Sequence, residues 1–274
     1  MAWLMVMSFL TLFGAVGVVV NVNALRWQRR VAQEVHALSA VSPSDLPLPA
    51  LTELPPPVAR YRALSLGDRA PVRTLRVRHT GTFCMSPTAK PLPIRGTQWF
   101  TADPPGFVWS ARIRWAPGLW VDARDMAANG AGSMRVFLDA TVPIADARGP
   151  ELDQGAALRL LAEMVWYPSV LFDARYVTWS PIDAAHAAAT LRFGARQVSG
   201  TFEFGSDGLP LGMKGERFMD KGALQPWSGT YRDWRTVSGL RVPFEASVTW
   251  QLESGPFTYA HWLIEGFDYD LAEP

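Results

Sequence analysis

The stretch ADARGPELDQGAALRLLAEMVWYPSVLF, residues 145–172, decides the fold. Pro150 begins a helix, because the first helical turn makes no use of the N–H that proline lacks. Pro168 ends this helix. Between the two prolines, apolar side chains recur at spacings of three and four residues and form one stripe, namely Leu158, Leu161, Ala162 and Val165. The stretch therefore predicts a single long amphipathic helix in the middle of the chain.

Most of the remaining chain reads as short strands. Residues 75–85, 107–115 and 241–252 alternate apolar and polar side chains, which is typical of half-buried strands. Turn sequences such as DPPG at 103–106 and NG at 129–130 join neighbouring strands into antiparallel hairpins. About twelve strands in one sheet must curl and cover their apolar face. We expect a mainly β (α+β) fold, a curved antiparallel sheet or half-barrel covered by the central helix.

Residues 1–25 contain no charged side chain, and a helix over residues 3–22 would be about 30 Å long, the thickness of a bilayer core. The segment therefore predicts a transmembrane helix or uncleaved signal anchor. A cleaved signal peptide is the alternative, suggested by the sequence Val22-Asn23-Ala24. The membrane, contacted through residues 1–25, is therefore an expected partner of the protein.

The arginines that follow this segment set the expected orientation. Arg26, Arg29 and Arg30 come directly after the span, and no basic side chain precedes it. We expect a single-pass protein of the bacterial inner membrane, and the positive-inside rule places its soluble domain on the cytoplasmic side, with the periplasmic side as the alternative. Residues 26–57 are expected to form a juxtamembrane helix and a Pro-rich linker, and residues 58–274 the β half-barrel domain.

Composition excludes several classes of function. The net charge is only +1, from 26 basic and 25 acidic side chains, so no broad nucleic-acid-binding face is expected. Cys84 is the only cysteine, which rules out an intrachain disulfide. The four histidines lie far apart in sequence and match no metal-ligand spacing. We expect no metal and no cofactor, and His79, which lies among apolar neighbours, is predicted to be a hydrogen-bonded core residue.

Polar residues around the central helix form the candidate polar cluster, which is Asp146, Arg148, Glu151, Asp153 and Glu163. Two carboxylates that converge in a cleft would supply a general acid and a general base. The alternative is helix capping and surface ion pairing, with Arg159 and Glu163 as an i,i+4 pair. Gly155 interrupts the helix at a cost of about 1 kcal/mol relative to alanine, which predicts the close approach of another backbone. Asp125 falls on an inward face and needs a partner. Arg112 or Arg114 could pair with it only if the face assignment of these strands slips, since both are expected on the opposite face.

A set of short motifs spans most of residues 54–269. They are LPPPVARY at 54–61, PPGFVWSARIRWAPGL at 104–119, ADARGPELDQG at 145–155, RLLAEMVWYP at 159–168, PWSG at 226–229 and GLRVP at 239–243. Together they resemble a bacterial family of domains with no assigned function, so the resemblance implies no activity and no catalytic residues. The strand–helix–strand layout is also similar to periplasmic lipoprotein-carrier half-barrels, whose concave face holds acyl chains, although fold alone does not fix function.

Three functions are compatible with these features. The first is a membrane-anchored module that binds an apolar or lipid-like ligand in the concave face, where sites are mostly apolar with few polar groups. Its candidate lining residues are Phe107, Trp109, Trp115, Phe202, Phe244 and Trp250, for which ordinary core packing is the alternative. The second is a carboxylate-based hydrolase built on the candidate polar cluster. The third is a structural or partner-binding membrane protein.

Overall fold

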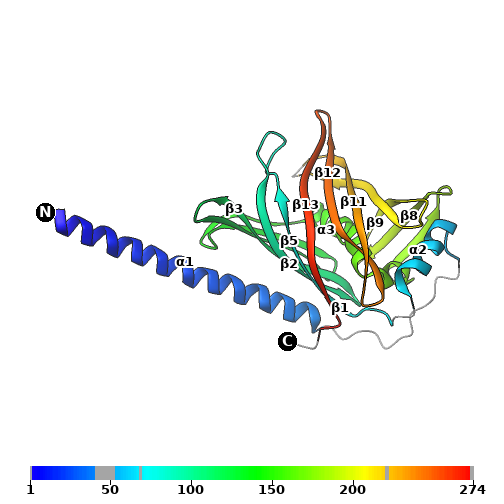
Figure 1. Cartoon of the computed structure of the whole chain (residues 1–274), viewed down its shortest axis with the longest axis horizontal. Coiled ribbons are helices and arrows are strands. Elements are labelled where there is room, and N and C mark those ends of the chain that lie inside the picture. The colour runs from blue at the N-terminus through cyan, green and yellow to red at the C-terminus, as the bar shows by residue number, and fades with distance from the viewer. Residues whose placement is uncertain (1, 41–52, 68–69, 220–221, 272–274) are drawn as a thin grey trace.

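A curved antiparallel sheet wraps around one helix. The computed structural model describes residues 2–40, 53–67, 70–219 and 222–271. Within them, a 13-stranded sheet curves around helix α3 (Pro150–Glu163), and Figure 1 shows α3 inside the hollow of the sheet. Every hydrogen-bonded strand pair is antiparallel. The predicted mainly β half-barrel with a central helix is confirmed.

The strands form two wings, one on each side of α3 in the sequence. The first wing contains β1 (Thr74–Phe83), β2 (Leu92–Ala102), β3 (Pro105–Ala116), β4 (Leu119–Ala128), β5 (Ala131–Leu138) and β6 (Val142–Arg148). The second wing contains β7 (Val177–Pro181), β8 (His186–Phe193), β9 (Arg196–Phe204), β10 (Pro210–Phe218), β11 (Leu224–Val237), β12 (Leu240–Leu252) and β13 (Gly255–Tyr269). The wings join where β1 pairs with β13. Each wing is a meander, so α3 is the crossover between two edges of one sheet.

Strand β6 is the one that the sequence did not predict. It pairs with β5, but most of its side chains are exposed, so it shows no alternation of apolar and polar residues. Asp146 was expected in the lead-in to the central helix and instead lies on this edge strand, where it pairs with Arg135 at 3.2 Å. An edge strand that is solvated on both faces shows no alternation of apolar and polar side chains. The sequence therefore predicted one strand fewer than the sheet contains.

Helix α3 begins at Pro150, as predicted, but it ends at Glu163 rather than at Tyr167. Two buried 3-10 helices follow, Met164–Trp166 and Pro168–Phe172. Pro168 has no N–H to donate to the carbonyl of residue 164, so the last α-helical turn cannot close. The amide of Tyr167 instead donates to the carbonyl of Met164 at 3.0 Å. The predicted apolar stripe is confirmed as buried core.

Helix α2 (Pro56–Leu66) packs on the second wing, where it contacts β8, β12 and the 3-10 helix Pro168–Phe172. Its Tyr61 is fully buried, and its ring packs against Phe172, Phe204 and Trp234. The proline triplet before it starts the helix, because prolines tolerate the first turn. Helix α2 therefore places the aromatic ring of Tyr61 between the second wing and the 3-10 helix Pro168–Phe172.

Helix α1 (Ala2–Ser39) lies on the outer face of the first wing and extends away from the half-barrel (Figure 1). Its buried residues Trp27, Val31 and Leu38 pack with Val108 of β3. The buried guanidinium of Arg124 lies 3.0 Å from the Glu34 carboxylate of α1. The predicted juxtamembrane helix is therefore also an element of the folded domain.

In the part of the chain that the structure describes, no helix has both the length and the hydropathy of a membrane span. The side chains of residues 1–14 and 16, which make up much of the predicted span 1–25, lie outside the described residues, as do residues 41–52 of the predicted linker.

Candidate functional site

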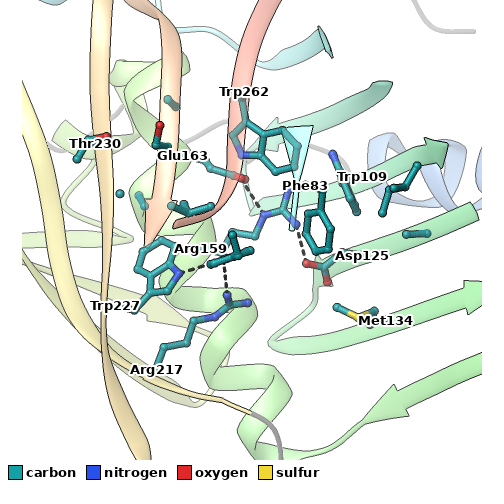
Figure 2. A pocket seen from close by; sticks show the side chains of 18 of the residues that line it. Phe83, Trp109, Asp125, Met134, Arg159, Glu163, Arg217, Trp227, Thr230 and Trp262 are labelled. Carbon is teal, nitrogen blue, oxygen red and sulfur yellow. Dashed lines mark hydrogen bonds and ion pairs between the residues drawn. The ribbon is translucent and has the colours of Figure 1, made fainter. Parts of the chain in front are cut away.

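A cavity of about 290 Å³ lies between α3 and the concave face of the sheet. Both wings contribute to it, and Figure 2 shows their side chains converging on it from opposite sides of α3. The lining is mostly apolar, because the alternation along each strand turns every second side chain inward. Its aromatic members are Phe83, Trp109, Trp166, Trp227, Tyr231, Tyr259 and Trp262. The polar groups that interrupt this surface are concentrated around two arginines.

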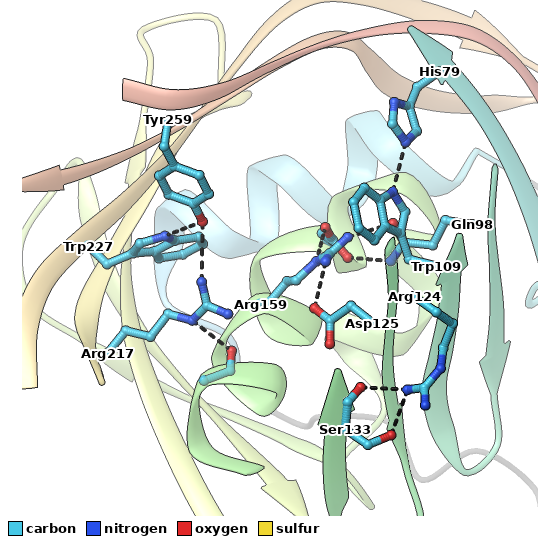
Figure 3. A network of polar contacts seen from close by, with 12 residues as sticks. His79, Gln98, Trp109, Arg124, Asp125, Ser133, Arg159, Arg217, Trp227 and Tyr259 are labelled. Carbon is cyan, nitrogen blue, oxygen red and sulfur yellow. Dashed lines mark hydrogen bonds and ion pairs between the residues drawn. The ribbon is translucent and has the colours of Figure 1, made fainter. Parts of the chain in front are cut away.

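Arg159 of α3 holds the polar network at the first-wing side of the cavity. Its Nη1 lies 2.7 Å from Asp125 Oδ2 and its Nε lies 2.8 Å from Glu163 Oε1. Its Nη2 donates to the Gln98 side-chain oxygen at 3.0 Å. The guanidinium also lies over the ring of Trp109, 5.0 Å from its centroid. Figure 3 shows this fork, in which one buried cation joins α3 to β2 and β4.

Burial and charge act against each other in this network. Burial lowers the pKa of Arg159, but the carboxylates of Glu163 and Asp125 outweigh it and raise this pKa above its ordinary value. Burial raises the pKa of the Glu163 carboxyl, although Arg159 and Gln98 act in the opposite direction. Both carboxylates are held by the same guanidinium, so the arrangement is that of a buried ion network rather than of a free acid and base.

Asp125 is the inward carboxylate that the sequence singled out. It is almost fully buried, and its partner is Arg159. The face assignment does not slip: Arg112 and Arg114 lie on the outer face of β3, as expected, where Arg112 pairs with Asp122 at 3.0 Å. The pairing across the core joins a strand to a helix that is distant in sequence, which strand alternation alone does not predict.

His79 of β1 supports the same side of the cavity. It is buried, and its Nε2 accepts a hydrogen bond from the indole N–H of Trp109 at 2.8 Å. Because an indole nitrogen only donates, His79 Nε2 must be unprotonated. Burial first, and the charge of Arg159 second, lower the pKa of His79 to about 3. The prediction of a hydrogen-bonded core histidine is confirmed.

Arg217 of β10 forms the polar centre on the second-wing side. Its Nε donates to the Gly155 carbonyl at 3.1 Å, and its Nη1 donates to the Tyr259 hydroxyl at 3.2 Å. The indole rings of Trp227 and Trp250 lie 5.6 and 5.7 Å from the guanidinium carbon. Among the described residues, no carboxylate pairs with Arg217.

Gly155 explains how this arginine fits beside the helix. A Cβ at this position would lie 2.9 Å from Arg217 Nε, which is too close for an undisturbed contact. The expected approach of another backbone is wrong, because it is a side chain that approaches. The glycine leaves room for the guanidinium and exposes the carbonyl that accepts from it.

Of the six predicted lining residues, only Trp109 lines the cavity. Phe107 lies behind it, with its ring centroid 4.8 Å from the guanidinium carbon of Arg159. Trp250 lies behind the cavity in the same way, next to Arg217. These two aromatic rings support the two arginines without being cavity wall.

The other three predicted lining residues lie elsewhere. Trp115 is 52% exposed, because the register shifts near the end of β3, beyond the part that α3 covers. Phe202 is fully buried against Trp179 and belongs to the core. Phe244 is half-buried and packs edge-on against Phe267. Alternation identifies inward faces, but it does not identify which inward residues remain uncovered by α3.

The structure separates the candidate polar cluster. Asp146 pairs with Arg135 at the sheet edge, while Arg148 and Glu151 are exposed. Asp153 lies at the start of α3, 3.1 Å from Arg196. Only Glu163 reaches the cavity. The ion-pairing interpretation therefore holds for Asp146 and Asp153, whereas within the described ranges no side chain caps the start of α3. The predicted i,i+4 pair of Arg159 and Glu163 is confirmed, but it is buried at the cavity rather than on the surface, and the cluster is not one site.

The most informative residues of the cavity were not predicted from sequence, namely Arg217, Trp227, Tyr259 and Trp262. One signal pointed toward them, because Gly155 in the middle of a helix marked the place where Arg217 enters. Asp125 on an inward face marked the need for a different buried cation, which is Arg159. In the described ranges, no group of His, Cys, Asp and Glu side chains could hold a metal ion.

A family model described as a family of unknown function (DUF6544) matches residues 47–262 of this chain. No curated protein matches the chain. Among solved structures, the chain is similar to a DUF1329 family protein from Desulfovibrio piger, with 12% identity, a TM-score of 0.43 and coverage of 80% of this chain and 95% of that one. It is also similar to a LolA superfamily protein from Nitrosomonas europaea, with 12% identity, a TM-score of 0.42 and coverage of 81% and 96%.

Proposed function

We propose that this chain, which belongs to the DUF6544 family of unknown function, binds an apolar, lipid-like molecule in the cavity beside α3. We also propose that its N-terminal segment holds it at a membrane. The observation that supports the proposal is the cavity itself, whose walls are formed largely by indole rings and aliphatic side chains. Binding sites for small molecules are concave and mostly apolar, with a few polar groups that orient the ligand.

The size of the cavity restricts the ligand. An apolar cavity of about 150 Å³ accommodates a benzene molecule. The cavity here, at about 290 Å³, is nearly twice as large and matches one hydrocarbon chain rather than a lipid with several acyl chains. Its position between two wings of one sheet also gives it walls that are fixed by the strand ladder.

The first experiment identifies a bound molecule. The full chain is purified, extracted with organic solvent and examined by lipid mass spectrometry. We expect a single-chain apolar species to be enriched over the lipids that copurify with an unrelated single-pass protein. Extracts that match this control would count against the proposal.

A cavity-filling variant tests the location. Ala246 of β12 lines the cavity, so Ala246→Phe places a ring in it. We expect loss of the enriched species, with overpacking costing about 1–3 kcal/mol. Thr249→Phe is the matched control, because Thr249 lies on the outer face of the same strand, where it contacts Thr258. If Ala246→Phe does not fold, Ala123→Leu on the opposite wing is the substitute. Retention of the species in a folded cavity-filling variant would place the ligand elsewhere.

The membrane part of the proposal rests on the N-terminal segment. Residues 1–25 carry no charged side chain, and in the described part of α1 the side chains of Val18, Val19 and Leu25 are exposed. We expect the full chain to stay with membranes after an alkaline wash and the double variant Val18→Asp, Val19→Asp to be released, because an aspartate in a span costs about 2.5–3.5 kcal/mol. Equal release of both proteins would contradict the anchor.

The orientation is proposed from Arg26, Arg29 and Arg30, which predict a cytoplasmic domain. Alkaline phosphatase fused after the last residue is active only outside the cytoplasm. We expect an inactive fusion, and an active one would place the domain in the periplasm.

A further inference from the structure

We infer that the ligand carries an anionic head group, a carboxylate or a phosphate on a single hydrocarbon chain, and that Arg217 and Tyr259 bind this group. The inference rests on the proposed function, since it specifies the polar end of the same ligand. It is drawn from the contrast between the partners of the two arginines in the cavity (Figure 3).

The first step concerns the charge of Arg217. Arg159 has two carboxylates within 2.8 Å, whereas the hydrogen bonds of Arg217 in the described chain go to a carbonyl and a hydroxyl, which carry no charge. A guanidinium has five N–H donors and no acceptor. In the described chain, two of these donors form the hydrogen bonds to Gly155 and Tyr259. The other donors lie on the same half-buried guanidinium, at the cavity wall.

The second step concerns the hydroxyl of Tyr259. Its oxygen accepts from Arg217 Nη1 at 3.2 Å and from Trp227 Nε1 at 3.0 Å. With both of these contacts directed at the oxygen, the O–H of Tyr259 is the group left to donate. Arg217 and Tyr259 therefore present donors, and no carboxylate among the described residues pairs with Arg217. An incoming anionic oxygen satisfies the guanidinium and the hydroxyl together, and charge-assisted hydrogen bonds of this kind are the strong ones.

The third step concerns the surroundings of Arg217. Trp227 and Trp250 flank the guanidinium, and Gly155 removes the side chain that would otherwise displace it. The arginine is therefore held in place before any ligand binds, which reduces the entropy lost on binding. The apolar wall beyond it, with Trp227 and Trp262, accommodates the hydrocarbon chain (Figure 2).

The experiment compares head groups on one chain length. The full chain in amphipol is titrated with ω-bromo-undecanoate, ω-bromo-undecyl phosphate and ω-bromo-undecanol, each of which quenches nearby tryptophan fluorescence through its bromine. We expect at least one anionic probe to bind about tenfold or more tightly than the alcohol, in line with a hydrogen bond to a charged group. The tighter of the two anionic probes identifies the head group.

Arg217→Met and its matched control locate the effect. We expect R217M to reduce the ratio of anion to alcohol affinity to near one, while R232M, which removes an exposed arginine of β11, keeps the wild-type ratio. Arg217→Lys keeps the charge but not the fork, and is expected to retain part of the preference. Tyr259→Phe is expected to lower the ratio less than R217M does.

The outcomes separate the inference from the proposed function. Binding of the alcohol and both anions with equal affinity would overturn the inference and leave the apolar site standing. Failure of every probe to quench would overturn both. Displacement of the anionic probes by acetate at similar concentration would show a site for free anions and would also overturn the inference. A ratio that R217M leaves unchanged would place the head group elsewhere.

Discussion

Arg159 and Arg217 line the same cavity, but they are satisfied in different ways. Arg159 comes from α3 and is held by Asp125 and Glu163, two buried carboxylates, whereas Arg217 comes from β10 and contacts neutral oxygens and indole rings. A buried cation must be paired because isolated charges are costly to bury. The comparison teaches that Arg159 already has its anions within the fold, while Arg217 has room for one from outside.

The largest difference is expected in stability. Arg159→Met leaves two carboxylates buried without a cation, so we expect a loss of about 3–5 kcal/mol in the free energy of unfolding. Urea titration followed by circular dichroism measures it. Adding Asp125→Asn and Glu163→Gln to the same chain should restore much of the loss, because the uncompensated charges are then gone. A loss below about 1 kcal/mol for the single variant would mean that the network is not structural.

The second prediction concerns pH on the Arg159 side. The pKa of His79 is lowered to about 3 in the folded chain, below the unfolded value of 6.5. The unfolded chain therefore binds more protons between these values, and stability is lost as the pH falls from 6.5 toward 3. At about 1.36 kcal/mol for each unit, His79 contributes a loss of about 2 kcal/mol between about pH 7 and about pH 5.

His79→Gln is the matched variant for this measurement, since its amide oxygen can accept from Trp109 but does not titrate. Unfolding free energies are compared at the two pH values. We expect the variant to lose less stability than the parent on acidification. Parallel pH profiles would indicate that His79 is protonated in the folded state.

A smaller change is expected on the other side of the cavity. Arg217→Met removes two hydrogen bonds to neutral acceptors and leaves no buried charge unpaired, so the expected cost is about 1–2 kcal/mol. The same urea titration, run beside Arg159→Met, gives the comparison directly. A cost equal to that of Arg159→Met would show that Arg217 is as structural as Arg159 and would weaken its assignment to a ligand.

The smallest change in stability is expected for Gly155→Ala. An alanine favours the helix by about 1 kcal/mol, but its Cβ would lie 2.9 Å from Arg217 Nε. We expect these effects to offset each other in thermal unfolding, while the displaced guanidinium lowers the preference for anionic probes. A variant that is more stable and keeps this preference would show that the glycine is not needed to position Arg217.

Local sequence patterns were sufficient for the fold class. Pro150 and the spacing of Leu158 and Leu161 gave the helix, and the alternation along β3 and β12 gave strands with one apolar face. These predictions succeed because period and turn chemistry act over a few neighbouring residues. They fail at β6, where both faces are solvated and no period remains.

The site was only partly accessible from sequence. Of the predicted lining residues, Trp109 lies in the cavity wall, whereas Trp115, Phe202 and Phe244 lie away from the cavity. Gly155 and Asp125 were recognised as unusual, but their partners were not identified. A pattern shows that a residue is out of place in its own element, and it does not show which distant side chain compensates for it.

The sequence by itself determined that an antiparallel half-barrel surrounds one mid-chain helix and that an uncharged segment precedes it. Only the tertiary structure decided that Asp125 joins the Arg159–Glu163 pair, that Arg217 enters at Gly155, and that a cavity remains between the two arginines. The physical reason is that secondary structure follows from interactions between near neighbours in the chain. Pairing and packing inside the half-barrel depend instead on where α3 crosses the sheet.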